Sequence, residues 1–414
     1  MAEKGEYGAD AGRRRQELCE YVMQAVDLSH DMTDEELYDL IDESICARMK
    51  EEYLSISEKL RLRKDIFNSI RRLDILQELV EDESISEIMV NGENQIFIEQ
   101  NGRVEQWGRC FSSRQKLEEV VQQIVSGANR MINEACPIVD ARLPDGSRVN
   151  IVLPPVALEG PIVTIRKFPE EALNMEKLVE RNSLTPEAAE FLRKLVIAGY
   201  NIFVSGGTGS GKTTFLNALS NDIPKDERII TIEDSAELQI RSIPNLVRLE
   251  VRNANSEGKN EISIRDLIKS SLRMRPDRII VGEVRDAAAI DMLQALNTGH
   301  NGMSTGHSNS PADMLSRLET MVLLGTDIPL LAVRKQIASA IDIVVHLGRL
   351  RDKSRHVLEI SEVLDCVDGE IELNRIFEFV EEGETPEGKI AGRLQGSAEG
   401  LIRRQKLKHA GLTI

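Results

Sequence analysis

Aromatic residues are scarce in this sequence. They make up 4% of its 414 residues, and Trp107 is the single tryptophan. Channels that bind single-stranded nucleic acid stack bases on aromatic side chains, so this scarcity argues against such a function. The formal net charge of -17 argues the same way, because an acidic protein repels a polyanion unless its basic groups gather on one face. We therefore expect no nucleic-acid partner.

Long hydrophobic runs and paired cysteines are also missing. The N-terminus lacks the apolar core of an export signal, and the most apolar stretch, 321–333, is short and contains Asp327 and Pro329. The five cysteines lie far apart and form no C-x-x-C pair, which argues against disulfides and zinc and fits a reducing compartment. These absences predict a cytoplasmic protein with no membrane span and no zinc site.

The length exceeds what one hydrophobic core usually supports, so several parts are expected. The pattern along the chain divides it into a helical N-terminal appendage, a smaller α+β domain, a linker, an α/β domain, and a strand-rich and helical C-terminal extension. The respective ranges are 1–75, 76–168, 169–184, 185–350 and 351–414. Within the appendage, Ser57 to Arg72 is basic, and this face is either a solvated helix surface or a docking surface for lipid headgroups or an acidic partner.

The range 185–350 alternates apolar strand segments with helical patterns. Strands are expected at 202–204, 229–232 and 279–281, and helices from 213, over 264–274 and over 287–296. Such alternation predicts a parallel sheet covered by helices, which places this domain in the α/β class.

A phosphate-binding loop of the pattern G-x-x-x-x-G-K-[ST] follows the first of these strands. It consists of Gly206, Gly207, Thr208, Gly209, Ser210, Gly211, Lys212 and Thr213, and Thr214 continues into the helix. A buried strand before the loop and a helix after it are the context that the motif requires. Glycines let successive backbone N–H groups surround a phosphate, and the helix N-terminus adds positive charge. Lys212 supplies a cation to the β- and γ-phosphates, and the Thr213 hydroxyl suits Mg²⁺, so ATP and Mg²⁺ are the expected ligands.

Two further strands end in carboxylates. Glu233 follows the strand at 229–232, and Glu283 follows the strand at 279–281. One acid should orient or deprotonate the attacking water and the other should hold Mg²⁺, although spacing alone leaves open which does which. Downstream, 297–310 is expected to be a small-residue loop, and His307 within it is either a surface histidine or a sensor of the γ-phosphate.

At this point the motifs resemble a known family. GGTGSGKTT, TIEDSAEL, IIVGEVRD and TGHNGMSTGHSNS follow one another like the Walker A, Asp, Walker B and His boxes of the type II/IV secretion ATPase superfamily, which contains PilT. LVEDESISEIMVNG, PDGSRVNIVLPP and TIRKF look like the CpaF-type ATPases of tight-adherence (Tad) pilus systems. The resemblance covers about 79–364.

The resemblance implies a homohexameric ring in which a flexible linker joins a mobile N-terminal domain to a RecA-like P-loop NTPase domain, with nucleotide bound between the two domains. It implies peripheral membrane association at the inner face of the cell membrane, on platform proteins of a pilus or secretion machine. It assigns Glu233 as general base, Glu283 as the acid near Mg²⁺ and His307 as the His-box residue, with His300 secondary. The arginine fingers would be Arg142, Arg148 and Arg166, which without the resemblance would be ordinary strand residues in salt bridges.

Three functions compete. The leading hypothesis is a mechanochemical ATPase that powers pilus assembly or secretion. The alternatives are a nucleic-acid translocase or helicase of RecA-like type, which the scarcity of aromatic residues disfavours, and a nucleotide-gated scaffold that hardly hydrolyses ATP. Glu233 and Glu283 beside Lys212 favour hydrolysis over the scaffold.

Overall fold

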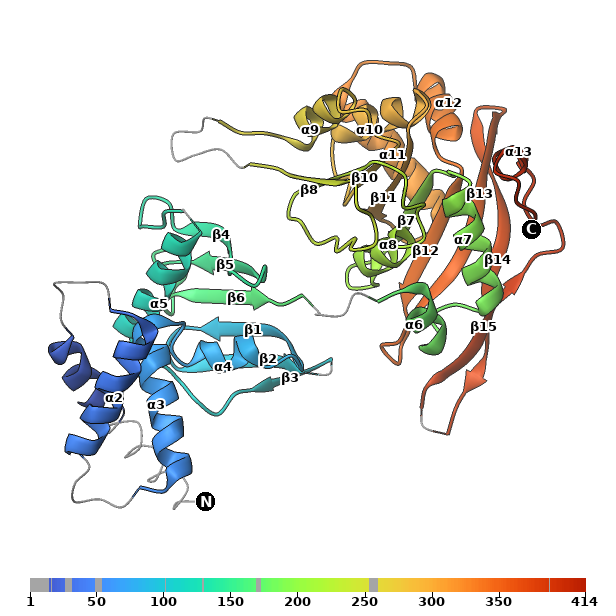
Figure 1. Cartoon of the computed structure of the whole chain (residues 1–414). Helices are drawn as coiled ribbons and strands as arrows, with labels where there is room; N and C mark the ends of the chain where they lie inside the picture. The colour runs from blue at the N-terminus through green and yellow to red at the C-terminus, as the bar shows by residue number, and fades with distance from the viewer. Residues whose placement is uncertain are drawn as a thin grey trace. The chain divides into compact units, whose positions relative to one another are not determined.

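The computed structural model describes residues 15, 17–26, 32–48, 54–100, 102–128, 130–168, 173–252, 260–386 and 388–414. The chain divides into two compact units, Met1–Glu170 and Glu171–Ile414 (Figure 1). We call them unit 1 and unit 2. In the parts of the chain that the structure describes, no helix is long and apolar enough to cross a membrane.

Unit 1 begins with a small helical cluster. Helices α2 (Asp34–Arg48) and α3 (Ile56–Arg71) pack around their own apolar core. Thr33 caps α2 by accepting a hydrogen bond from the Glu36 amide. The expected basic face on α3 is partly neutralised, because Arg63 lies 3.1 Å from an Asp42 carboxylate oxygen and Lys64 donates to Glu81.

An antiparallel six-stranded sheet forms the rest of unit 1, in the order β3-β2-β1-β6-β5-β4 (Figure 1). The strands are β1 (Ile85–Asn91), β2 (Gln95–Gln100), β3 (Arg103–Gln106), β4 (Ile138–Arg142), β5 (Arg148–Val152) and β6 (Ile162–Arg166). Helices α4 (Leu76–Glu81) and α5 (Arg114–Gly127) bury their apolar residues against the sheet. Ser113 caps α5, because its side chain accepts a hydrogen bond from the Lys116 amide.

Unit 2 is built on a nine-stranded sheet in the order β15-β14-β13-β12-β7-β11-β10-β8-β9 (Figure 1). The strands are β7 (Ile202–Gly206), β8 (Ile229–Glu233), β9 (Leu246–Glu250), β10 (Arg278–Val281), β11 (Asn301–His307), β12 (Ile343–Arg349), β13 (Arg355–Val367), β14 (Glu370–Glu384) and β15 (Ile390–Gly396). Pairing from β12 through β9 is parallel, as the sequence predicts, and β12 through β15 pair antiparallel.

Helices cover both faces of this sheet. Successive strand residues point to opposite faces, so Ile202 and Val204 of β7 belong to one core and Phe203 to the other. The first core packs against α6 (Met175–Glu180), α7 (Pro186–Ile197), α8 (Lys212–Ser220) and α13 (Gln405–His409). The second packs against α9 (Ile264–Ser271), α10 (Ala288–Asn297), α11 (Pro311–Gly325) and α12 (Leu330–Ala340). A sheet buried on both faces explains why its parallel strands read as apolar runs.

Two expected parts differ from the structure. The range 169–184, expected to be a linker, contains α6, whose Met175 and Leu178 are buried in the core of unit 2, while 169–172 lie outside the described residues. The range 351–414, expected to be a separate extension, supplies β13, β14 and β15 to the same nine-stranded sheet. Hydrogen bonding to β12 therefore makes these strands part of the domain that holds the phosphate loop.

The segment at 401–409 is hydrogen-bonded to the rest of unit 2 through the buried carboxylate of Glu362. Glu362 is 1% exposed and accepts hydrogen bonds from the Ile402 and Arg403 amides and from Asn374 Nδ2. Lys406 donates 2.6 Å to an Asp342 carboxylate oxygen. These bonds hold the segment at 401–409 against the sheet.

Candidate functional site

The loop between β7 and α8 requires glycine at specific positions. Gly206 has a φ of +152°, and a Cβ there would lie 2.4 Å from the Leu347 carbonyl oxygen and 2.7 Å from Ser210 Oγ. Gly211 has a φ of +93°, a conformation that side chains strongly disfavour. The sequence pattern is therefore explained by close backbone packing at one end of the loop and by backbone conformation at the other.

Helix α8 presents its N-terminus at the end of this loop. Lys212 begins the helix, and Thr213 and Thr214 lie in its first turn. The first turn of a helix has amides without intrahelical partners and a partial positive charge, so it is an anion-binding site. The Lys212 side chain is mostly buried, and its Nζ donates 2.9 Å to the Gly207 carbonyl oxygen.

A chain of polar contacts runs from Lys212 across the carboxyl ends of neighbouring strands. Lys212 Nζ lies 3.2 Å from His307 Nδ1, and His307 Nε2 lies 3.0 Å from Glu283 Oε1. Glu283 Oε2 accepts a hydrogen bond of 2.6 Å from Arg285 Nη2. Because an ammonium group only donates, His307 Nδ1 must accept and Nε2 carries the proton. The geometry therefore selects one neutral tautomer of His307.

The pKa shifts follow this arrangement. Burial and the charge of Lys212 lower the pKa of His307, so its imidazole is neutral at pH 7. Burial also lowers the pKa of Lys212, which Glu283 partly offsets. Burial raises the pKa of Glu283, but Arg285, His307 and Lys212 outweigh this effect and leave the pKa below its ordinary value. Glu283 is thus a stable carboxylate.

Glu233 differs from Glu283 in its surroundings. It ends β8, is 2% exposed, and its Oε2 accepts the Glu237 and Leu238 amides at 2.7 and 2.9 Å. Its Oε1 is buried and has no hydrogen-bond partner among the described residues, which is also true of Glu283 Oε1. Burial raises the pKa of Glu233 against the lowering effect of those amides. A fixed carboxylate with one open oxygen and a raised pKa suits a proton acceptor.

Gly282 explains why the second acidic strand ends in Gly-Glu. A Cβ at this position would lie 2.9 Å from Glu233 Cγ. Strand β10 pairs with β8, so the two strand ends lie side by side. The absence of a side chain at 282 leaves room for Glu233.

The oxygen donors at this edge of the sheet fit Mg²⁺. Within the described ranges, no group of three His, Cys, Asp or Glu side chains could hold a metal by itself. Thr213 and Glu283 offer a hydroxyl and a carboxylate oxygen, and Mg²⁺ commonly takes few protein ligands while keeping phosphate oxygens and waters. The assignment of both residues to Mg²⁺ stays a prediction.

Residues 71–389 match the protein family described as Type II/IV secretion system protein, and this range is well over half of the chain. The chain belongs to this family. It is 35% identical over 308 residues to the type IV secretion system protein PtlH of Bordetella pertussis, covering 67% of this chain and 89% of PtlH. It is 34% identical over 290 residues to the conjugal transfer protein TrbB of Rhizobium radiobacter, covering 69% and 85%.

The fold also resembles a solved member of this class of secretion ATPases. The structure of the ATPase DotB of Legionella pneumophila matches with a TM-score of 0.50 at 22% identity, covering 68% of this chain and 78% of DotB. The family match over 71–389 confirms the predicted superfamily, while the narrower resemblance to Tad pilus ATPases stays a prediction.

In this secretion-family chain, the segment at 297–310 is not the loop that its composition suggests. Strand β11 runs through it between β7 and β10 and is largely buried. His307 ends this strand in register with Gly206, which is why it reaches Lys212. His300 precedes the strand and lies roughly 20 Å away along it, at 3.3 Å per residue. It contacts the Ala295 carbonyl oxygen at the end of α10.

The three predicted arginines lie on neighbouring strands of unit 1. Arg142 is opposite Arg148 and Arg148 is opposite Arg166, so the three form one row across β4, β5 and β6. Glu87 extends the row on β1. Residues opposite one another in antiparallel strands have side chains on the same face, and like charges placed so are destabilising. The structure brings these arginines together, and their part in catalysis stays a prediction.

Sequence reasoning missed Arg355, the first residue of β13. Its Nε donates 2.8 Å to the Gly209 carbonyl oxygen of the phosphate loop. No motif marks Arg355, which lies far along the chain from Gly209 and reaches it only through the pairing of β12 with both β7 and β13.

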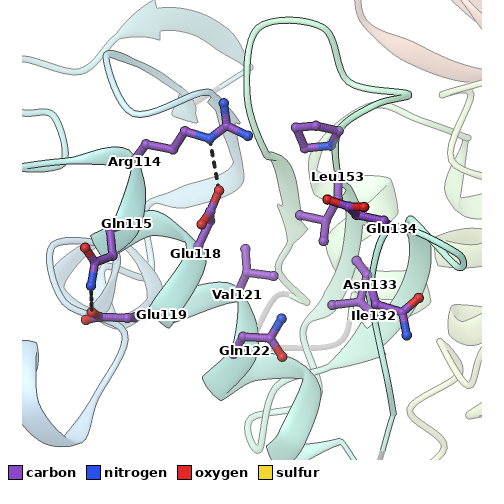
Figure 2. Close-up of a pocket in the computed structure, with 11 residues that line it drawn as sticks. Arg114, Gln115, Glu118, Glu119, Val121, Gln122, Ile132, Asn133, Glu134 and Leu153 are labelled. Atoms are coloured by element: carbon purple, nitrogen blue, oxygen red, sulfur yellow. Dashed lines mark hydrogen bonds and ion pairs between the residues drawn. The ribbon is translucent and has the colours of Figure 1, made fainter.

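A separate pocket of 640 Å³ lies in unit 1, beside α5 (Figure 2). It is lined by Arg114, Gln115, Glu118, Glu119, Val121, Gln122, Ile132, Asn133, Glu134, Leu153 and Pro154. Two hydrogen-bonded pairs inside α5, Arg114 with Glu118 and Gln115 with Glu119, lie on one side of the pocket, and Asn133 and Glu134 lie on the other (Figure 2). None of the predicted site residues lines this pocket.

Proposed function

We propose that this chain hydrolyses ATP to power a secretion or pilus machine. Membership of the type II/IV secretion system family supports the class of machine. The observation that carries the proposal is the set of contacts joining Lys212, His307 and Glu283 beside the phosphate loop, with Glu233 at the end of β8. A nucleotide binder without hydrolysis has no need of two acids in different electrostatic states.

The two acids take different roles in this proposal. Glu233 orients the attacking water and accepts its proton at the open Oε1, because its pKa is raised by burial. Glu283 stays ionised, lies with its Oε1 3.0 Å from His307 Nε2, and offers an oxygen toward Mg²⁺. Bound Mg²⁺ would neutralise phosphate charge.

Lys212 changes partners when nucleotide binds. Lys212 Nζ contacts two neutral acceptors, the Gly207 carbonyl oxygen and His307 Nδ1. A phosphate oxygen is a charged acceptor and takes their place when nucleotide binds. His307 then remains beside the γ-phosphate as a hydrogen-bonding group connected to Glu283. This exchange couples phosphate occupancy to the contacts at the end of β11.

The arginine row of unit 1, Arg142, Arg148 and Arg166, supplies positive charge to the transferred phosphoryl group in this proposal. We propose that the active form is a homohexamer in which these arginines act at the phosphate loop of an adjacent subunit. The resemblance of the N-terminal motifs to those of Tad ATPases supports the proposal that the machine is a Tad pilus system. The protein works at the inner face of the cell membrane on platform proteins.

The test is steady-state ATP hydrolysis by the purified full chain with Mg²⁺. Lys212→Ala removes the cation at the β- and γ-phosphates, and we expect turnover to fall by several powers of ten. Lys194→Ala is the matched control, because Lys194 lies on α7 and its partner is Glu190. Near-normal turnover in the Lys212→Ala protein, or no hydrolysis by the unaltered protein, would contradict the proposal.

A further inference from the structure

Arg355 contacts the phosphate loop from the side away from the acids. Its Nε donates to the Gly209 carbonyl oxygen, and its Cδ lies 3.5 Å from the point that a Cβ on Gly211 would occupy. The aliphatic part of the side chain therefore lies over the loop, and the guanidinium sits at its edge. Among the described residues, the structure records no partner for Arg355 Nη1 or Nη2.

The hairpin that carries Arg355 is held in a defined shape. Leu350 donates its amide to the Ser354 carbonyl oxygen. Asp352 accepts hydrogen bonds from the Ser354 amide and hydroxyl, and its other oxygen accepts the Ile390 amide. These bonds lower the pKa of Asp352 to about 2. Arg355 is thus presented to the phosphate loop by a hairpin fixed to the rest of the sheet.

Strand order indicates which part of a nucleotide Arg355 faces. Strand β7, which leads into the phosphate loop, lies between β12 on one side and β11, β10 and β8 on the other. The carboxylates Glu233 and Glu283 follow β8 and β10. A triphosphate whose γ-phosphate points toward those acids extends its nucleoside in the opposite direction, toward β12 and β13.

The direction of the loop's backbone groups supports the same assignment. Loop amides that hold a phosphate point into the cradle, whereas Arg355 bonds a carbonyl oxygen and so lies outside that cradle. An arginine guanidinium is planar and stacks on aromatic rings, so it suits the face of a purine.

We propose that Arg355 holds the nucleoside end of the bound nucleotide by packing its guanidinium against the base. This inference rests on the proposed function, since it concerns the same site. Arg355 is then a positioning residue for ATP. Loss of its side chain should weaken binding of the nucleoside part of ATP and leave binding of the triphosphate part unchanged.

The experiment measures binding of two probes to the full chain by calorimetry with Mg²⁺. The probes are ATP and inorganic tripolyphosphate, which has the phosphates without ribose or base. For Arg355→Ala we expect ATP to bind about tenfold more weakly, as for the loss of a desolvated cation–π contact, with tripolyphosphate unchanged. The KM for ATP should rise while kcat at saturation stays within about twofold.

Two further variants make the result decisive. Arg355→Lys keeps the charge and loses the planar group, so it should resemble Arg355→Ala for ATP. Arg351→Ala, in the same hairpin but bonded to Glu381 and Glu384, should leave both probes unaffected. Equal weakening of ATP and tripolyphosphate, rescue by lysine, or unchanged ATP binding each overturns the inference. If the unaltered protein binds no ATP, the proposed function fails instead.

Discussion

The two units arrange charge in opposite ways. In unit 2, Lys212 contacts the neutral His307, and both His307 and Arg285 contact the carboxylate of Glu283. In unit 1, guanidinium groups are neighbours of one another in the row of Arg142, Arg148 and Arg166. The groups of unit 2 thus meet groups that are neutral or of opposite charge, whereas the three arginines of unit 1 lie next to one another and meet an acid, Glu87, at one end of the row.

This difference suggests a division of labour. Phosphoryl transfer needs groups that bind phosphate and handle a proton, and it also needs positive charge for the equatorial oxygens of the transition state. Unit 2 has the groups suited to phosphate binding and proton transfer, and they contact one another within one site. Unit 1 has three arginines together in one row, and their part in the second task is a proposal.

Arg148→Ala should lower ATP turnover by about three powers of ten, the usual effect of losing an arginine finger. Arg103→Ala is the control, because Arg103 lies on the outer strand β3 opposite Gln100 and outside the row. Mixing Arg148→Ala protein with Lys212→Ala protein should partly restore turnover, since some interfaces then pair an intact arginine with an intact phosphate loop. No restoration at any ratio, with subunit exchange shown independently, would place Arg148 within its own chain or outside catalysis.

Glu233→Gln should lower turnover by at least about two powers of ten while ATP binding persists. The amide keeps the shape of the buried side chain and loses the capacity to accept a proton. Glu250→Gln is a matched control, because Glu250 ends β9 in register with Glu233. Single-turnover kinetics and calorimetry separate hydrolysis from binding. If Glu283→Gln gives this phenotype while Glu233→Gln stays active, the roles of the two acids are reversed.

Glu362→Gln should destabilise unit 2 without affecting unit 1. Glu362 is a buried acceptor for three donors, and hydrogen bonds to a charged group contribute about 1.5–3 kcal/mol. A loss of about 2 kcal/mol corresponds to roughly 5 °C in Tm for a domain of this size. Scanning calorimetry should show the shift in one transition, and Glu378→Gln, an exposed control on β14, should show none. A shift of both transitions together would mean that the units do not unfold separately.

The smallest expected effect is on pH dependence. The pKa of His307 lies below its ordinary value, so below the ordinary pKa the unfolded chain binds more protons than the folded chain. The free energy of unfolding should therefore rise as the pH increases from the pKa of His307 in the folded chain to the ordinary pKa of histidine. His307→Gln should flatten this rise, as measured by Tm against pH. An equal rise in the unaltered protein and in the His307→Gln protein would contradict this prediction.

Much of the site could be predicted because it follows local patterns. The phosphate loop has its own spacing, and Glu233 and Glu283 each follow an apolar run that forms a parallel strand. Strand β11 could not be predicted in this way, because glycine, serine, asparagine and threonine dominate it. Its glycines are explained by packing, since a Cβ on Gly302 would lie 2.5 Å from Leu296 and one on Gly306 would lie 2.9 Å from Met314.

The parts that the sequence did not predict depend on long-range pairing. Arg355 reaches the phosphate loop because β12 pairs with both β13 and β7. These pairings between distant segments cannot be read from local patterns in one sequence. In the same way, the segment that forms α6 is expected to be a linker because its helical pattern is short. Its Met175 and Leu178 are nevertheless buried in a core that includes residues of distant strands. Tertiary burial therefore decides what the local pattern leaves open.

The packing of Gly282 against Glu233 has an evolutionary consequence. Since a Cβ at position 282 would come within 2.9 Å of Glu233 Cγ, a mutation to any larger residue there forces the Glu233 carboxylate to move. The two positions are consequently epistatic: an Asp-Glu pair at 282–283 becomes acceptable only with an altered residue or rotamer at 233. Homologous chains should change at these two sites together, and a deep alignment of the family can be searched for that covariation.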